Sequence, residues 1–385
     1  MSAKNTVFYS SCVALSPMVK AGRTPLRVLS LEYGADLVYT EEIVDEKLLK
    51  STRVVNKALN TIDYTLRDEI VLRIAKEENG KCVLQIGTNS AIKAAEICKK
   101  FDQDVDAIDV NMGCPKVFST HNGMGAALLT QPDNVRQILT AMTDVSSVPI
   151  SCKIRVLNDH EKTMEFAKMV QNCGISGLGI HGRRKDERPS HANRIQEIRE
   201  IAKYLDIPVI ANGCSSMIKK HSDIHKLREE CGSSSIMLAT RVLSNPSIFR
   251  QEGLLTMTQE IENFLDKACE WDESYVGTKY VVQRILGSAQ EFDERGRASV
   301  AAGDVIDICR PWGKESKYLE CKQGRLGIQN STQLELINGV YVGPIRFAQK
   351  KLQNCLANSS PKCVLNLYCD ELDVPRPEYS HYKTR

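Results

Sequence analysis

The sequence lacks the features of a membrane protein and of a disulfide-stabilised secreted protein. No window approaches the roughly 18 uninterrupted apolar residues of a membrane span, and the start MSAKNTVFYS has no basic flank before an apolar stretch. The fourteen cysteines include no C-x-x-C pair, and no histidine stands at zinc-ligand spacing. We therefore expect a cytoplasmic protein with no membrane partner and no metal site, whose cysteines are mostly reduced core residues.

The chain also has little net charge and no dinucleotide-binding glycine motif. A formal charge of +3 over 385 residues is too small to indicate a nucleic-acid or membrane partner by itself. No G-x-G-x-x-G follows the first apolar run, which disfavours a doubly wound open sheet. With 42% hydrophobic and 26% charged residues, the chain can fill one large core and a smaller one.

Eight short apolar runs recur between about residues 12 and 250, each followed by a polar turn and a segment of helical period. One such segment places Val135, Ile138, Leu139 and Met142 on a single helical face. Strands buried on both faces and alternating with helices predict an α/β fold, and eight units match a (β/α)8 TIM barrel of about 250 residues. The runs are CVALSP, ADLVYTE, CVLQIG, AIDVNMG, VPISCKIRV, GLGIHG, IPVIANG and SIMLAT.

Beyond the barrel the pattern becomes helical. The segments TQEIENFLDKACEW and TKYVVQRILGSAQEF are amphipathic and predict a small helical bundle. We therefore assign residues 1–250 to the barrel, 251–335 to a helical domain with a linker, and 336–385 to a basic extension. From residue 343 onward seven Lys and Arg stand against four Asp and Glu, so this tail alone carries +3.

Polar residues interrupt the apolar runs where the strands are expected to end. The carboxyl ends of the strands form the functional face of such a barrel. Any one of these residues is more often structural, but several on one rim indicate a site. The loops after the seventh and eighth runs suit a phosphate held by backbone amides, which would fit FMN or a phosphorylated substrate. The candidates are Ser16, Pro17, Met18, Gln85, Asn111, Cys114, Lys153, Arg155, His181, Asn212, Gly213, Thr240 and Arg241.

Several longer motifs occur in order along the barrel: SPMVKAGRTPLRVLSLEYGADLVYTEE, LQIGT, DVNMGCPK with GMGAALL, CKIRV, IHGRRKDERP, PVIANG and NPSIF. In these motifs the chain resembles the tRNA-dihydrouridine synthases of the eukaryotic Dus2 type. The resemblance implies an FMN-dependent reductase that uses NADPH to reduce the C5–C6 double bond of a D-loop uridine in tRNA, at position twenty by analogy. It implies flavin contacts from Pro17, Met18, Gln85, Asn111, Lys153 and His181, and phosphate contacts from Asn212, Gly213, Ala239 and Thr240.

The same resemblance makes Cys114 the catalytic cysteine, although a buried cysteine is most often only a small core residue. Hydride addition at uracil C6 requires a proton at C5 from a positioned acid. A thiol with a pKa of about 8.5 is protonated near neutral pH and can supply that proton. We expect Gly123 and Gly125 to let the following loop move over substrate.

Two positions depart from the family pattern. Cys214 stands where a second glycine usually follows Gly213, and we expect its Cβ to be tolerated if the backbone keeps a negative φ. The family's arginine would fall at Thr240, whereas this chain has Arg241 one place later. A displaced arginine predicts a bound but more easily lost flavin.

Two basic segments are candidates for contact with tRNA. Arg183, Arg184, Lys185 and Arg188 follow the sixth run on the expected functional face, although Asp186 and Glu187 also allow an ordinary solvated loop. The tail PKCVLNLYCDELDVPRPEYSHYKTR resembles the start of a double-stranded-RNA-binding domain, and Arg346, Lys350 and Lys351 precede it. We expect both segments to contact RNA phosphates and the protein to act as a monomer.

Two other functions fit the residues. A flavin barrel that reduces a small pyrimidine-like substrate would need the same rim, and it predicts activity without tRNA. A non-catalytic RNA-binding protein on a decayed barrel would explain the two departures, and it predicts that Cys114→Ala leaves tRNA dihydrouridine unchanged.

Overall fold

The computed structural model describes residues 6–331, 335–337 and 340–342. Contacts between Cα atoms divide the chain into two units, Met1–Gln329 and Asn330–Arg385. The barrel and most of the helices that follow it lie in the first of these units, and the division of the chain at residues 250 and 335 stays a prediction. Arg346, Lys350, Lys351 and the segment resembling an RNA-binding domain lie outside the described residues.

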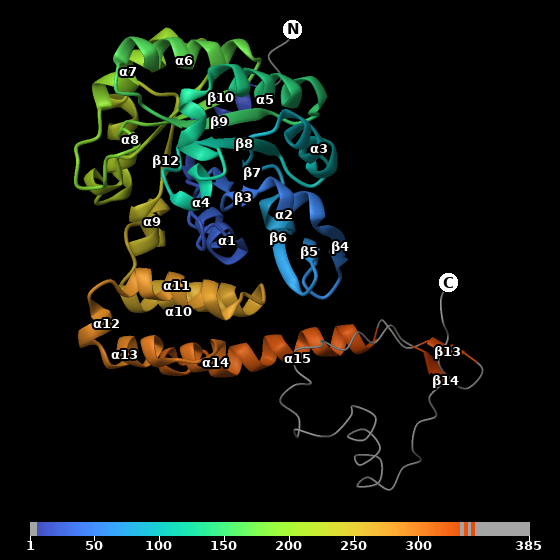
Figure 1. Cartoon of the computed structure of the whole chain (residues 1–385). Helices are drawn as coiled ribbons and strands as arrows, with labels where there is room; N and C mark the ends of the chain where they lie inside the picture. The colour runs from blue at the N-terminus through green and yellow to red at the C-terminus, as the bar shows by residue number, and fades with distance from the viewer. Residues whose placement is uncertain (1–5, 332–334, 338–339, 343–385) are drawn as a thin grey trace, which may run out of the picture. The chain divides into compact units, whose positions relative to one another are not determined.

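Eight parallel strands form a closed ring, as predicted (Figure 1). Each of the eight apolar runs contains one strand, and pairing between β2 and β7, with Val38 opposite Cys82, closes the barrel. The short strand β3 (Ile43–Val44) pairs in parallel with the carboxyl end of β7, Ile43 opposite Ile86. The barrel strands are β1 (Val13–Leu15), β2 (Leu37–Tyr39), β7 (Cys82–Gly87), β8 (Ala107–Met112), β9 (Ile150–Arg155), β10 (Gly177–His181), β11 (Val209–Asn212) and β12 (Ser235–Leu238).

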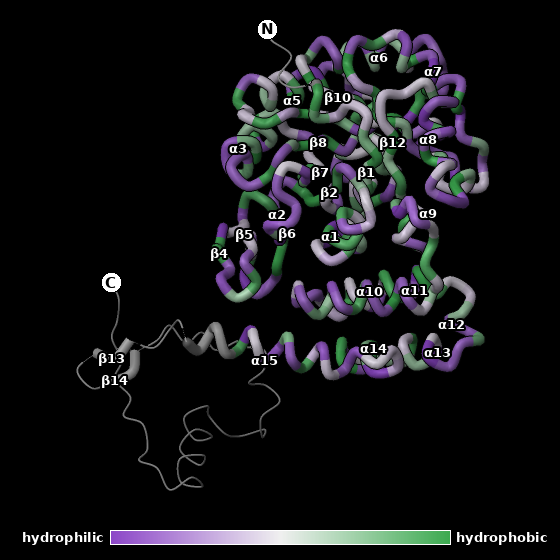
Figure 2. Tube along the Cα trace, turned by 180° about the vertical axis from the view of Figure 1, so that it is seen from behind, coloured by the Kyte–Doolittle hydropathy of each residue, from purple (hydrophilic) through white to green (hydrophobic). Residues whose placement is uncertain are grey.

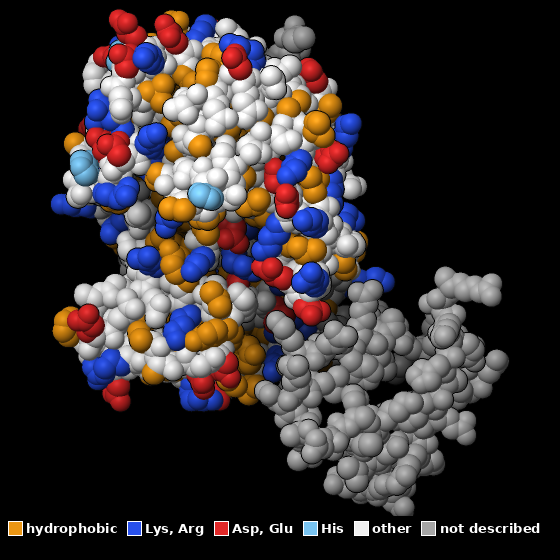
Figure 3. Space-filling model, in the orientation of Figure 1, with side chains coloured by type: hydrophobic (Ala, Val, Ile, Leu, Met, Phe, Trp, Pro, Cys, Tyr) orange, Lys and Arg blue, Asp and Glu red, His pale blue; other side chains and the backbone are white. Residues whose placement is uncertain are grey.

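Amphipathic helices cover the outside of the ring. The predicted face of α5 is correct, because Val135, Ile138, Leu139 and Met142 are all fully buried. Figure 2 shows hydrophobic residues concentrated in the barrel strands, and Figure 3 shows acidic and basic side chains mixed over the face in view. The helices are α1 (Thr24–Glu32), α2 (Asp45–Lys50), α3 (Ala91–Phe101), α4 (Val117–Thr120), α5 (Pro132–Val145), α6 (His160–Asn172), α7 (Ile195–Tyr204), α8 (His221–Glu230) and α9 (Thr240–Ser244).

A separate apolar cluster, contributed by β1, β2, β7, β8, β11 and β12, lies inside the barrel. Tyr9, at the end of the 3-10 turn Thr6–Tyr9, belongs to this cluster and is fully buried. A Cβ at Gly177, the first residue of β10, would lie 2.7 Å from the Tyr9 ring, so glycine makes room for it. Because this cluster closes the amino-terminal end of the barrel, the interior is left open to polar groups at the carboxyl ends of the strands.

An antiparallel sheet between β2 and β7 was missed by the sequence analysis. It consists of β4 (Thr52–Asn56), β5 (Thr61–Leu66) and β6 (Glu69–Ala75), where a helical segment was expected. Tyr64 of β5 packs on Phe101 and donates a hydrogen bond to Asp104 Oδ2 at 2.5 Å, which joins this sheet to α3. Three of the seven residues of the run EIVLRIA are β-branched, which favours a strand.

Helices follow the barrel, as predicted. Asn263 Nδ2 donates to Tyr33 Oη at 2.8 Å, and Glu260 Oε1 accepts from the amide of Ser247 at 2.8 Å, so α10 is held against the barrel. The last of these helices, α15, extends to Ser331, close to the end of the predicted helical domain and linker at residue 335. The elements are α10 (Met257–Glu270), α11 (Tyr275–Leu286), α12 (Ala289–Phe292), α13 (Glu294–Ala301), α14 (Val305–Cys309) and α15 (Glu315–Ser331), then the antiparallel pair β13 (Glu335–Ile337) and β14 (Val340–Val342).

The expected state of the cysteines is confirmed for the part of the chain that the structure describes. There every cysteine is free, and all are buried except the partly exposed Cys114 and Cys321. Within the same residues no group of three or more His, Cys, Asp or Glu side chains could hold a metal ion. None of the described helices is long and apolar enough to cross a membrane.

Candidate functional site

Buried polar side chains on β7, β8 and β9 form a continuous hydrogen-bonded row inside the barrel. Gln85 Nε2 donates to Asp109 Oδ2 at 2.8 Å, and Asn111 Nδ2 donates to Gln85 Oε1 at 3.2 Å. Ser151 Oγ donates to Asp109 Oδ1 at 2.7 Å. Burial raises the pKa of Asp109 to about 6, although the bonds from Gln85 and Ser151 oppose the rise. The sequence analysis missed Asp109 and Ser151, which lie two residues before Asn111 and Lys153 and share their side of the strands.

Two hydrogen-bond donors stand beside this row. Burial and the neighbouring Arg155 lower the pKa of Lys153 to about 8, and among the described residues no acceptor lies within hydrogen-bond distance of its Nζ. His181 Nδ1 accepts the amide N–H of Arg183 at 3.1 Å, which assigns the ring proton to Nε2. Burial, then the charges of Lys153, Arg155 and Arg183, lower the pKa of His181 to about 2, so the imidazole is neutral.

The turn after β11 depends on glycine at position 213. Gly213 has φ +99°, and a Cβ there would lie 2.5 Å from Asn193 Oδ1, so glycine is required. Cys214 has φ −88°, which confirms that a side chain is tolerated at this departure from the family pattern. The adjacent Asn212 is buried and donates from Nδ2 to the carbonyl of Met237 at 3.0 Å.

The neighbouring strand β12 ends at the amino terminus of α9. The amide of Ala239 donates weakly to Ser215 Oγ at 3.4 Å, while Thr240 is exposed. The first amides of α9, on Thr240 and Arg241, have no acceptor within their own helix. The Nε of Arg241 is buried and has no hydrogen-bond partner, so an unused donor lies near this helix start.

The segment that carries Cys114 is fixed at both ends. Asn111 Oδ1 accepts the amides of Gly113 and Cys114, each at 2.9 Å, and the Cys114 carbonyl accepts the amide of Ala126 at 2.9 Å. Arg155 Nε donates to the Gly113 carbonyl at 2.8 Å. Burial and then the negative charge of Glu42 raise the pKa of the Cys114 thiol. The thiol is therefore protonated near neutral pH, as the proposed acid must be.

Comparison with known proteins decides the family. The model of the dihydrouridine synthase (Dus) family matches residues 14–295. The chain belongs to the dihydrouridine synthase family. It is similar to a tRNA-dihydrouridine(20) synthase (NAD(P)+) of Schizosaccharomyces pombe, with 34% identity over 305 residues that cover 76% of this chain and 63% of that protein.

Two further relatives support the same family. A tRNA-dihydrouridine(20) synthase (NAD(P)+) of Saccharomyces cerevisiae is 33% identical over 359 residues, which cover 85% of this chain and 93% of that protein. A tRNA-dihydrouridine synthase B of Xanthomonas axonopodis pv. citri is 29% identical over 252 residues, which cover 65% and 71% respectively. The chain thus spans just under two thirds of the fission yeast relative and nearly all of the budding yeast one.

Pro17 and Met18, which the Dus resemblance implies as flavin contacts, follow β1. The amide of Ser16 donates to the Leu238 carbonyl at 2.8 Å, so these residues begin beside the end of β12. Both are partly buried, and Met18 packs against the main core. They lie at the same carboxyl end of the barrel as the candidates on the other strands.

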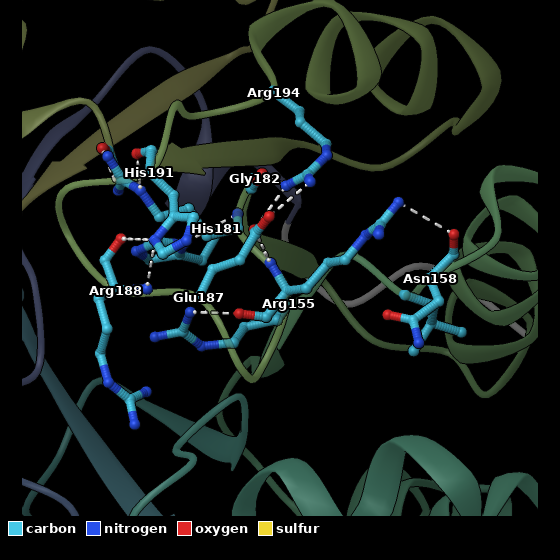
Figure 4. Close-up of polar contacts among 12 residues, drawn as sticks. Arg155, Asn158, His181, Gly182, Glu187, Arg188, His191 and Arg194 are labelled. Atoms are coloured by element: carbon cyan, nitrogen blue, oxygen red, sulfur yellow. Dashed lines mark hydrogen bonds and ion pairs between the residues drawn. The ribbon is translucent and has the colours of Figure 1, made fainter.

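The basic loop after β10 separates into anchored and exposed residues in this Dus protein. Figure 4 shows polar contacts within it, among them those between Glu187 and Arg194. Arg183 is only 6% exposed, and its guanidinium donates to the carbonyls of His191, Gly213 and Pro189 at 2.6, 2.9 and 3.3 Å. Arg183 is therefore placed as an anchor of the loop rather than as a surface cation. Lys185 and Arg188 are exposed.

The two acidic residues of this loop do not offset its positive charge equally. Glu187 receives two hydrogen bonds of 2.6 Å from Arg194, which lower its pKa to about 2. The amide of Arg184 also donates to Glu187 Oε2 at 2.7 Å, and Arg184 Nη2 donates to the Asn158 carbonyl at 3.1 Å. Glu187 therefore acts within the loop, which leaves only Asp186 between the exposed cations.

Proposed function

We propose that this protein is an FMN-dependent tRNA-dihydrouridine synthase that takes electrons from NADPH. It reduces the C5–C6 double bond of a D-loop uridine, the one at position twenty by analogy with the relatives, and Cys114 is the general acid. The observation that carries the proposal is the convergence, at one end of a Dus-family barrel, of a protonated thiol, a neutral imidazole and a lysine without an acceptor.

The donors at this rim fit a flavin. Lys153 Nζ and His181 Nε2–H are free to meet acceptor atoms of a polar ring, and the Gln85–Asn111 pair offers amides next to them. Gly213 permits close approach of backbone to a phosphate, and Arg241 has an unused Nε–H. When bound, FMN would supply the hydride that adds to uracil C6.

Cys114 then supplies the proton that C5 requires. Its pKa is raised by burial and by Glu42, so the sulfur holds its proton near neutral pH without an activating base. The amide of Gly113 donates to Asn111 Oδ1 and its carbonyl accepts from Arg155 Nε, so the backbone beside Cys114 is fixed and the position of the thiol is limited. Such positioned acids typically contribute about 10² to 10⁴ in rate.

The substrate must be a nucleotide that has left its stack, because a stacked base cannot enter a barrel rim. We assign phosphate contacts to the exposed Lys185 and Arg188, and a positioning role to Arg183, whose guanidinium is used by backbone carbonyls. Arg346, Lys350 and Lys351 remain candidates for the same task from the C-terminal extension.

The purified protein tests this proposal. In Cys114→Ala we expect NADPH to bleach the bound flavin at the wild-type rate, while tRNA-dependent reoxidation slows at least about 100-fold because the acid is missing. Cys321→Ala is the matched control, since Cys321 is the other partly exposed cysteine of the described residues. Unchanged reoxidation in Cys114→Ala would contradict the acid role, and reoxidation by free uracil without tRNA would favour a small-molecule reductase.

A further inference from the structure

A buried carboxylate lies next to Cys114, and the proposed chemistry does not use it. Glu42 follows β2 and is 7% exposed. Its Oε1 accepts a hydrogen bond from Ser119 Oγ at 3.0 Å, while its Oε2 is buried without a hydrogen-bond partner. An unpaired buried carboxylate oxygen costs stability. The fold alone therefore gives no reason for a carboxylate at this position.

The surrounding backbone leaves room for this group. A Cβ at Gly87, the end of β7, would lie 2.7 Å from Glu42 Oε1. A Cβ at Gly125 would lie 2.4 Å from Ser119 Oγ and 2.6 Å from the Cys114 carbonyl, and Gly125 has φ +57°. Two glycines thus permit the contacts that run from Glu42 through Ser119 to the segment carrying Cys114.

This segment is closed by its own backbone hydrogen bonds. The amide of Ala126 donates to the Cys114 carbonyl at 2.9 Å, and the amide of Met124 donates to the Ser119 carbonyl at 3.1 Å. The only side-chain bond that the structure describes from Ser119 goes to Glu42. Loss of the Glu42 carboxylate would therefore free one side of the segment 114–126.

The charged groups around the Cys114 thiol are of both signs. Glu42 is the acidic one: burial raises its own pKa, the hydrogen bond from Ser119 opposes that rise, and as a carboxylate it disfavours the thiolate. Lys116 on the same segment favours the thiolate, and Lys153 and Arg155 on β9 also interact with the sulfur as cations. Without Glu42, the cations Lys116, Lys153 and Arg155 would favour the thiolate more strongly, and a thiolate cannot donate a proton.

We propose that Glu42 is a positioning residue for Cys114, which fixes the segment 114–126 through Ser119 and offsets the nearby cations so that the sulfur keeps its proton. This inference rests on the proposed role of Cys114 as the acid. It gives the loop after β2 a role at the site, although none of its residues was among the candidates named from the sequence.

Alkylation of Cys114 tests the electrostatic half directly. The rate of iodoacetamide reaction at Cys114 is followed against pH by mass spectrometry of its peptide, which separates it from the other cysteines. In Glu42→Gln we expect the midpoint to move to lower pH by about one unit, or about tenfold faster alkylation at a fixed pH below it. Glu42→Asp keeps the charge and should return the midpoint toward the wild-type value.

Three outcomes decide the inference. An unchanged midpoint in folded Glu42→Gln would overturn the electrostatic half. Ser119→Ala should keep the pH midpoint of alkylation and speed amide hydrogen exchange in 114–126 at least about fivefold. Unchanged exchange would overturn the positioning half, even if Glu42→Gln does not fold. If Cys114→Ala is fully active but the midpoint still moves, Glu42 controls the thiol as inferred and the acid role of Cys114 fails.

Discussion

Acidification should destabilise this protein through His181 more than through any ordinary surface histidine. The pKa of His181 is lowered to about 2 by burial and by Lys153, Arg155 and Arg183, whereas an unfolded histidine titrates near 6.5. Because the folded-state pKa is depressed, the stability from this residue is complete above about pH 6.5 and is lost as pH falls through that value toward 2.

The size of the effect follows from the two pKa values. At about pH 5 the unfolded histidine is protonated and the folded one is not. This pH lies roughly 1.5 units below the pKa of the unfolded histidine. At about 1.4 kcal/mol per unit, unfolding becomes easier by about 2 kcal/mol relative to pH 8. The effect comes from one ring, so removing the ring should remove it.

His181→Asn is the suitable change because Asn Oδ1 can still accept the amide N–H of Arg183. Both proteins are unfolded in urea at about pH 8 and at about pH 5. For each protein the free energy of unfolding at the lower pH is subtracted from that at the higher pH, and the two losses are compared. We expect the wild type to lose about 2 kcal/mol more than the variant. Equal losses would mean that His181 is already charged or solvated, which would refute its assignment as a neutral donor at the rim.

Other substitutions test the loops around the rim. Gly213→Ala should weaken FMN binding about tenfold, because a Cβ meets Asn193 Oδ1 at 2.5 Å and the positive φ adds strain. Cys214→Gly, at a position with φ −88°, should leave FMN binding unchanged. Titration followed by flavin fluorescence measures both affinities. The pair Lys185→Gln and Arg188→Gln should weaken tRNA binding and reduce the slope of log K against log salt by about one for each phosphate that is no longer neutralised. Equal slopes in filter-binding assays would place these cations outside the RNA interface.

The barrel could be predicted because its signals are local. Each strand is a short apolar run with its own turn, and the α5 stripe from Val135 to Met142 has the period of a surface helix. The inserted sheet β4–β6 was missed because its strands alternate less clearly and their partners are set by pairing with one another. Where hairpins replace a crossover helix, periodicity in one segment is not sufficient.

The site was predictable as a set of strand ends but not as a network. Gln85, Asn111, Lys153 and His181 were named as candidates because each interrupts an apolar run, and the structure places them on the neighbouring strands β7 to β10. Glu42 was missed because its contacts come from residues far away in sequence, such as Ser119. Likewise, sequence could not separate the buried Arg183 from its exposed neighbours, since burial depends on which carbonyls fold over it.

The most direct test of the account is a map of dihydrouridine in tRNA from cells that lack this protein. The account predicts that dihydrouridine disappears from the D-loop at position twenty, returns with the wild-type gene, and does not return with Cys114→Ala expressed at the same level. Restoration of dihydrouridine by Cys114→Ala, or no loss of it in the cells that lack the protein, would contradict the account.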